Sequence, residues 1–138
     1  MRIGVDKRNS IRRMPDMIYF IRQRNKLKIG YTEDVDRRIK ELQTGSPVRL
    51  QLLKVIPGDQ VLERQIHELF KEKRAQGEWF HYSGVLKACV KVLCEGHNPT
   101  SLVEWRRVGL QRIMRETANK KARKGDNTLK QKIRGLTV

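Results

Sequence analysis

The chain has 138 residues, enough for one domain of ordinary size and an appendage but not for two independent cores. Its formal net charge is +16, with 31 Lys and Arg against 15 Asp and Glu. The longest aliphatic or aromatic run, residues 17–21, is far shorter than the roughly 20 residues needed to span a bilayer. No cleavable apolar segment begins the sequence. We therefore expect a soluble, cytoplasmic protein without a membrane-spanning segment.

The positive charge is concentrated at the two ends of the chain. Residues 1–15 hold five Lys and Arg against one acid, and residues 104–138 hold eleven against three. Residues 16–103 are closer to balance, with fifteen against eleven. Clustered cations favour a polyanionic partner, because cations placed on phosphates release condensed counterions. DNA, RNA and an anionic membrane surface are all compatible with this charge.

Three segments between the ends have the character of strands. Residues 17–21 and 27–31 are rich in β-branched and aromatic residues, and the polar turn between them contains Asn25, so we predict a β-hairpin. Residues 49–56 form a third predicted strand, which Pro57 and Gly58 end. With the helices below, this predicts an α+β fold around a small antiparallel three-stranded sheet.

Three helices alternate with these strands. The first begins at Thr32 as N-cap and carries an apolar stripe at i, i+4 and i+7. The second spans about residues 60–74, with Asp59 as its cap. Residues 77–80 are predicted to leave that helix with two buried aromatics. The third helix, about residues 84–93, is apolar on most of its circumference and is predicted to lie against the sheet.

The composition changes before the basic end of the chain. Residues 102–116 form a predicted helix, and after Thr117 apolar residues are too scarce for the tail to fold alone. We therefore divide the chain into a basic N-terminal extension (residues 1–15), a domain (16–96) and a basic helical extension (97–138) that is partly disordered when free. Eight cations of this extension are predicted to bind nucleic-acid phosphates without reading sequence: Arg106, Arg107, Arg112, Arg115, Lys120, Lys121, Arg123 and Lys124.

The only cysteines are Cys89 and Cys94, in an apolar stretch. Their number and spacing do not indicate a disulfide framework. Cys94 with His97 has the spacing of half a zinc site, but no second pair matches it. We predict that both cysteines are buried structural thiols.

Helical wheels at 100° per residue select candidate polar residues. Arg38 lies roughly 65° from the apolar stripe of the first helix, whereas Arg37 lies almost opposite that stripe. Glu63 lies about 75° from the stripe of the second helix, with His67 one turn later on the same side. These residues can form a polar site, and the same positions also suit a helix-surface pair and a snorkelling arginine.

Five motifs in one order resemble the GIY-YIG nuclease superfamily, most closely its small phage and bacterial branch. They cover about residues 16–95 and are Met17 to Tyr19, Lys28 to Gly30 with Thr32, the R-I-x-E-L-Q-T-G run from Arg38 to Gly45, the E-x-x-x-H-x-x-F run from Glu63 to Phe70, and Gly77 to Phe80. The resemblance implies cleavage of phosphodiester bonds in DNA with one divalent metal, Mg²⁺ or Mn²⁺. It also implies a bacterial or phage-infected host cell.

Carried over position by position, the resemblance makes Glu63 the metal-binding carboxylate and Arg38 the electrophilic stabiliser, with Tyr19 lining the site. One carboxylate can suffice, because Mg²⁺ keeps several waters and takes other ligands from the substrate phosphate. Metal and guanidinium together would offset the charge that develops on the phosphorane.

Lys28 stands where the family pattern has its second tyrosine. Water activation would then fall to Tyr19, Tyr31 or His67. Because an imidazole suits neutral pH better than a phenol, we favour His67 or Tyr19, with little to separate them. The main hypothesis is a metal-dependent DNA endonuclease. The alternative, which Lys28 keeps open, is a non-catalytic DNA-binding module of the same fold with a regulatory or genome-handling role; an RNA-associated structural protein is a third.

Overall fold

The structure is a computed structural model that describes residues 15–136, and the side chains of residues 15–123. The predicted basic extension of residues 1–15 therefore lies outside the described residues except for Pro15. The side chain of Lys124, one of the predicted phosphate contacts, also lies outside them.

The fold is built around one antiparallel sheet of five strands in the order β3-β1-β2-β5-β4. The strands are β1 (Met17–Gln23), β2 (Lys26–Thr32), β3 (Gln51–Pro57), β4 (Arg74–Gln76) and β5 (Trp79–His81). The predicted α+β class and the β-hairpin are confirmed, whereas the prediction of three strands is wrong. β4 and β5 have three residues each, too few to show an alternating pattern, and their pairing depends on tertiary contacts.

Four helices accompany the sheet: α2 (Val35–Thr44), α3 (Gln60–Leu69), α4 (Gly84–Cys94) and α5 (Leu102–Leu136). Asp34, not Thr32, caps α2 by accepting from the backbone N–H of Arg37, and the Thr32 hydroxyl instead accepts from the Asp34 backbone. Asp59 caps α3 as predicted, through the N–H of Leu62. α3 ends at Leu69, and a 3-10 turn (η1, Lys71–Lys73) leads into β4.

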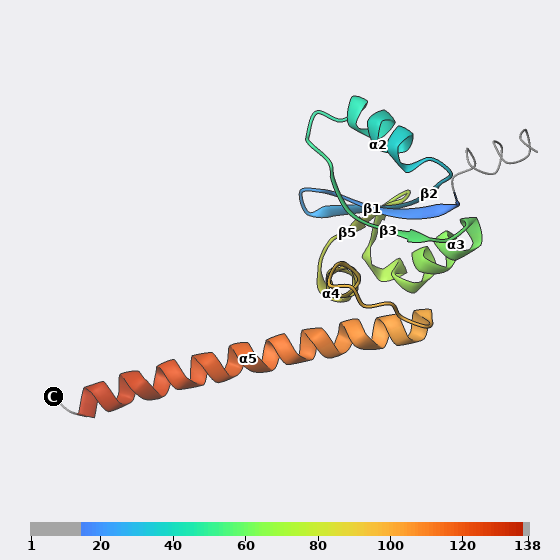
Figure 1. Ribbon diagram of the computed structural model, residues 1–138. Helices are drawn as coiled ribbons and strands as arrows, with labels where there is room; N and C mark the ends of the chain where they lie inside the picture. The colour runs from blue at the N-terminus through green and yellow to red at the C-terminus, as the bar shows by residue number, and fades with distance from the viewer. Residues whose placement is uncertain (1–14, 137–138) are drawn as a thin grey trace, which may run out of the picture.

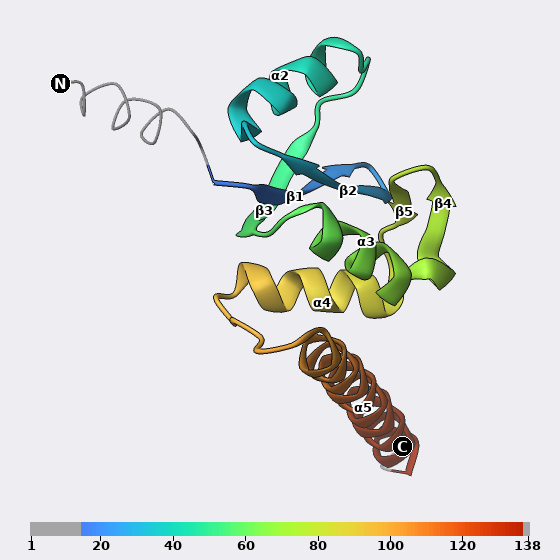
Figure 2. The ribbon, with the colours of Figure 1, turned by 90° about the vertical axis from the view of Figure 1, so that its right-hand side faces the viewer.

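The helices cover the two faces of the sheet unequally (Figure 1). α2 lies over one face, whereas α3 and α4 lie against the other, as the turned view also shows (Figure 2). Strand alternation sends Ile18 and Phe20 of β1 into the main core with α3 and α4, and turns Tyr19 toward α2. α2 has no buried residue, so its apolar stripe is only partly covered. The face beneath α2 therefore keeps room for polar side chains.

α5 is anchored to the domain through its first turns. Trp105 is 2% exposed, and its indole N–H donates to the Cys89 carbonyl at 2.8 Å. Its ring lies edge-on to Phe20 and Phe70, with centroids 6.2 and 5.2 Å apart. The helix then continues to Leu136, past its predicted end at residue 116. Lys, Arg, Gln and Ala are good helix formers, so local propensity extends the helix where the scarcity of apolar residues predicted a tail.

The two cysteines lie in different environments. Cys89 is buried as predicted, and burial raises the pKa of its thiol to about 12. Cys94 is exposed, so the prediction of a buried thiol is wrong there. Cys94 is exposed because it is the last residue of α4 and lies on the polar side of this helix.

Candidate active site at the edge of strand β2

Side chains of α3 occupy the part of the β2 edge that β5 leaves open. β5 pairs only with residues Lys26 to Lys28 of β2. Beyond them, His67 Nε2 lies 2.8 Å from the Ile29 carbonyl oxygen. One turn earlier on α3, Glu63 lies beside the backbone of Tyr31. Burial raises the pKa of the Glu63 carboxyl, and its hydrogen bond with this backbone opposes part of that rise. α3 thus fixes both predicted site residues against the sheet.

Tyr19 and Arg38 meet on the face of the sheet under α2. Tyr19 is 1% exposed and stands opposite Gly30 on β2, where any Cβ would overlap the tyrosine ring. Because the Tyr19 ring lies against the backbone of Gly30, we expect that no larger residue fits at this position. Arg38 Nε donates to the Tyr19 hydroxyl at 3.4 Å. Arg38 is half-buried and Arg37 is exposed, so Arg38 borders the packed face and Arg37 points to solvent, as the helical wheel predicts.

Lys28 forms the next part of this face. Lys28 is only 9% exposed, and its ammonium nitrogen lies 3.0 Å from a carboxylate oxygen of Glu78. The same ammonium lies 5.3 Å from the centre of the Trp79 ring. Glu78 joins β4 to β5, and its carbonyl accepts from the Ile29 N–H at 3.1 Å. Glu78 is the site residue that sequence reasoning did not select, and the G-E-W-F motif was its only signal.

The ionisable groups of the site influence one another. Burial raises the pKa of Glu63, the negative charge of Glu78 raises it further, and His67 and Lys28 oppose both effects. Burial also raises the pKa of Tyr19, against the lowering effect of its hydrogen bond from Arg38. Glu63 and Glu78 both act on Tyr19. The phenol, the guanidinium and the two carboxylates therefore lie within electrostatic range of one another.

Tyr31 lies at the rim of the site. Its hydroxyl donates to Glu33 at 3.4 Å, and its pKa is raised by desolvation and by the neighbouring acids Asp16 and Glu33. It shares with Arg38 the lining of an open cavity of about 390 Å³ beside the start of α2. The Tyr31 hydroxyl thus faces acidic neighbours at the rim of the site, and its hydrogen bond goes to Glu33 and not to Arg38, Glu63 or His67.

The predicted phosphate-binding cations of α5 divide into two groups. Arg106 donates to the Leu69 carbonyl at 3.0 Å and pairs with Glu72 at 3.0 Å. Arg112 pairs with Glu95 and, at 3.1 Å, with Glu116. These two arginines attach α5 to its own domain or to itself. The other cations of this set with described side chains are exposed: Arg107, Arg115, Lys120, Lys121 and Arg123.

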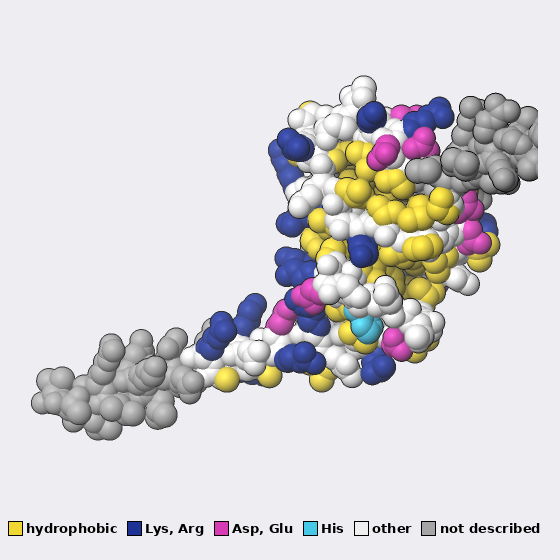
Figure 3. All heavy atoms as spheres, in the orientation of Figure 1, with side chains coloured by type: hydrophobic (Ala, Val, Ile, Leu, Met, Phe, Trp, Pro, Cys, Tyr) yellow, Lys and Arg dark blue, Asp and Glu magenta, His cyan; other side chains and the backbone are white. Residues whose placement is uncertain are grey.

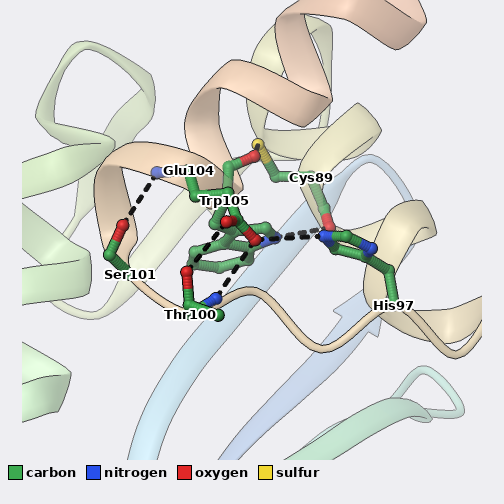
Figure 4. Close-up of polar contacts among 6 residues, drawn as sticks. All are labelled: Cys89, His97, Thr100, Ser101, Glu104 and Trp105. Atoms are coloured by element: carbon green, nitrogen blue, oxygen red, sulfur yellow. Dashed lines mark hydrogen bonds and ion pairs between the residues drawn. The ribbon is translucent and has the colours of Figure 1, made fainter.

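The segment before α5 and the first turn of α5 contain a hydrogen-bonded cluster (Figure 4). His97 Nε2 lies 3.6 Å from Glu104, which also accepts from the backbone and hydroxyl of Thr100 at 3.1 and 2.8 Å. The Ser101 hydroxyl accepts from the Glu104 N–H, so the cluster caps α5. Within residues 15–123 no group of three or more His, Cys, Asp or Glu side chains is placed to hold a metal ion.

The described part of the molecule is thus a small α+β domain whose sheet carries a carboxylate, an imidazole, a phenol and a guanidinium. The T5orf172 domain model matches residues 16–94, more than half of the chain. The chain therefore belongs to the T5orf172 domain family, a phage-associated, nuclease-related domain. Comparisons with curated proteins and with solved structures find no match.

The family model covers nearly the same residues as the five motifs, which span about residues 16–95, and the match is consistent with a nuclease or DNA-binding role. The described residues include no helix that is long and apolar enough to cross a membrane.

Proposed function

We propose that the protein is a metal-dependent DNA endonuclease that hydrolyses phosphodiester bonds at the β2 edge, and that exposed cations of α5 hold the DNA. The observation that carries this proposal is the convergence of Glu63 and His67 from α3 with Tyr19 from β1 and Arg38 from α2. The residues come from three separate elements, and the membership of a nuclease-related family supports the same reading.

Glu63 has the properties of a carboxylate suited to a divalent cation. It is partly buried, and this burial, together with the negative charge of Glu78, raises its pKa. A cation would therefore neutralise repulsion that the protein alone leaves in place. Mg²⁺ fits a site with so few protein ligands because it retains waters and accepts substrate oxygens. When bound, such an ion supplies Lewis-acid stabilisation of the phosphoryl group and the leaving oxygen.

Arg38 is suited to binding the scissile phosphate. Its Nε donates to Tyr19, which fixes the plane of the guanidinium and leaves its terminal N–H groups for phosphate oxygens. Since the Tyr19 oxygen accepts from Arg38, the tyrosine O–H remains available to donate. We propose that Arg38 stabilises the negative charge that develops on the phosphate, and that Tyr19 positions the Arg38 guanidinium.

His67 is the better candidate for accepting the proton of the attacking water. The Ile29 carbonyl can only accept, so His67 Nε2 must carry a proton and Nδ1 of the neutral ring carries the lone pair. Tyr19 is less suited to this role, because burial raises its pKa and disfavours the phenolate. This difference supports His67 over Tyr19, between which the sequence offered little to choose.

Cleavage of supercoiled plasmid tests the proposal. We expect nicking that requires Mg²⁺ or Mn²⁺ and is lost in Glu63→Gln and Arg38→Ala. Arg37→Ala is the matched control, because it removes the neighbouring exposed arginine and should retain most of the activity. Metal-independent nicking, or nicking that survives Glu63→Gln, would contradict this assignment of the site.

One observation favours the alternative of a non-catalytic DNA-binding module. Lys28 occupies the second-motif position and places a fixed positive charge on Glu78, within electrostatic range of Glu63. A fixed ammonium can neutralise a carboxylate site without any metal. Tight DNA binding by the unmodified protein, with no nicking in either metal, would support this alternative.

A further inference from the structure

The turn between β1 and β2 holds an arginine in a backbone conformation that suits glycine. Gln23 pairs with Lys26, so only Arg24 and Asn25 form the turn. Arg24 has φ 55°, and it is the one residue other than glycine with positive φ among those the structure describes. Two-residue turns with positive φ at their first position favour glycine there, because a Cβ is strained in this region. Arg24 is thus locally unfavourable for folding.

Other cations gather around this turn. Arg22 Nε donates to the Arg24 carbonyl at 2.7 Å, and its guanidinium lies 5.0 Å from the centre of the Tyr82 ring. Lys87 of α4 lies over the same ring at 5.7 Å. The Tyr82 N–H donates to the Asn25 carbonyl at 2.8 Å, which ties the turn to the start of α4. We call Arg22, Arg24, Lys26 and Lys87 the hairpin basic surface.

No acidic side chain among the described residues pairs with these cations. None of the four forms an ion pair with any described side chain, in contrast to Arg106 and Arg112 of α5. Figure 3 shows Lys and Arg side chains gathered along the margin of the domain above α5. Two cations that converge on one ring repel each other, and a bound polyanion would relieve that repulsion.

We propose that the hairpin basic surface binds the phosphate backbone of duplex DNA. The choice of DNA rests on the proposed function. Base stacking does not fit the surface, because Tyr82 is only 8% exposed and Arg22 and Lys87 lie over its ring. Point charges without an exposed aromatic platform suit phosphates, which position a duplex without reading its sequence.

The surface is separate from the site at Glu63. The turn is at the Lys26 end of β2, whereas Glu63 lies beside Tyr31 near the other end. Lys26 and Tyr31 are five positions apart on an extended strand, a distance of roughly 17 Å. A duplex that contacts the hairpin basic surface can therefore extend along β2 toward Glu63, and α5 need not supply every contact.

The test compares DNA affinity with folding stability in the full chain. Arg24→Gly relieves the backbone strain and removes one cation, so it should raise the melting temperature while it weakens binding of a labelled DNA duplex. The slope of log affinity against log salt should fall by about 0.9 for this variant and by about twice that for Arg22→Gln with Lys87→Gln. A residue with only a structural role would not shift stability and affinity in opposite directions.

Lys71→Gln is the charge-matched control, because Lys71 is exposed, pairs with Glu68 and lies outside the surface. The proposal is wrong if both sets of variants change affinity and salt slope no more than this control does. In that case DNA binding and nicking by the unmodified chain would leave the proposed function intact. Binding that is weakened only for duplex RNA would also overturn the proposal, and no DNA binding by the unmodified chain would remove the proposed function itself.

Discussion

The Lys28 ammonium lies 3.0 Å from the Glu78 carboxylate, and Glu78 in turn raises the pKa of Glu63. Lys28 is the more buried of the two partners, so its charge is poorly screened by water. It also acts directly on Glu63, whose pKa it lowers. Lys28 therefore limits the negative charge that the two carboxylates together present to a cation.

We predict that Lys28→Met increases the affinity for Mn²⁺ on the order of tenfold, the size of a coulombic effect of about 1.4 kcal/mol. The substitution removes the positive charge and frees Glu78 beside Glu63, so two carboxylates become available in place of one. Isothermal titration calorimetry with the DNA-free protein measures this directly.

The control variants for this prediction separate charge from packing. Lys28→Arg keeps the positive charge and should leave Mn²⁺ affinity close to that of the unmodified protein. Adding Glu78→Gln to Lys28→Met should remove most of the gain. Equal affinities for Lys28→Met and the unmodified protein would mean that Glu78 does not reach the cation.

Glu63 should make folding stability depend on pH. Burial and the charge of Glu78 raise its pKa in the folded state above the unfolded value. The folded protein then binds the Glu63 proton more tightly than the unfolded chain does. The contribution of Glu63 to the free energy of unfolding is therefore fully present below the pKa of the unfolded carboxyl, and it is lost as the pH rises through the pKa of the folded state. We predict that Glu63→Gln, which cannot ionise, gains melting temperature relative to the unmodified protein between about pH 4 and pH 7.

Thermal melts across this pH range, without divalent metal, measure the effect. Glu68→Gln is a suitable control, because Glu68 is exposed on the same helix and is paired with Lys71. A difference in melting temperature that stays constant with pH would show that Glu63 titrates in the folded state as it does in the unfolded chain.

The parts of the site that the sequence predicts depend on local periodicity. The positions of Arg38, Glu63 and His67 follow from which side of a helix is apolar, and the apolar stripe of a helix is readable from its own residues. The end of α3 was less predictable. Its pattern continues to residue 74, but the structure gives the last residues to η1 and β4, where pairing with β5 replaces helical hydrogen bonds.

Glu78 and the pairing of Lys28 depend on contacts between distant segments. Lys28 meets Glu78 because β5 pairs with β2, and a strand of three residues leaves almost no pattern in the sequence. Arg106 and Arg112 illustrate the same limit. Charge alone assigned them to nucleic acid, whereas their ion pairs with Glu72 and Glu95 require the packing of α5 on the domain.

His67 should show separable structural and chemical roles. His67→Ala leaves the Ile29 carbonyl without its partner, at a cost of about 1–3 kcal/mol where that carbonyl stays buried. In His67→Gln the side-chain amide can donate to the same carbonyl, so most of this stability should remain. Neither variant offers an imidazole lone pair, and both should lose nicking by about 100-fold or more.

Chemical denaturation and plasmid nicking on the same preparations separate the two roles. Nitrogen-15 NMR of His67 in the unmodified protein gives an independent check, because the hydrogen bond to Ile29 requires the tautomer with the proton on Nε2. Full activity in His67→Gln would assign water activation to another group.

Gly109 sets how closely α5 can approach α4. A Cβ at this position would overlap Cys89 Sγ and press against the Cys89 backbone, so Gly109→Ala should destabilise the fold by about 1–3 kcal/mol, less the gain in helix propensity of about 1 kcal/mol. Thr117→Ala, on an exposed part of α5, shows a gain in helix propensity without a packing change; this gain should be smaller, because threonine is a better helix former than glycine. Combining Gly109→Ala with Cys89→Ala removes the overlapping sulfur and should recover part of the loss, because the two side chains share one space. Additive losses in urea denaturation would show that Gly109 and Cys89 are independent, and that the α4 and α5 contact is not limited by this pair.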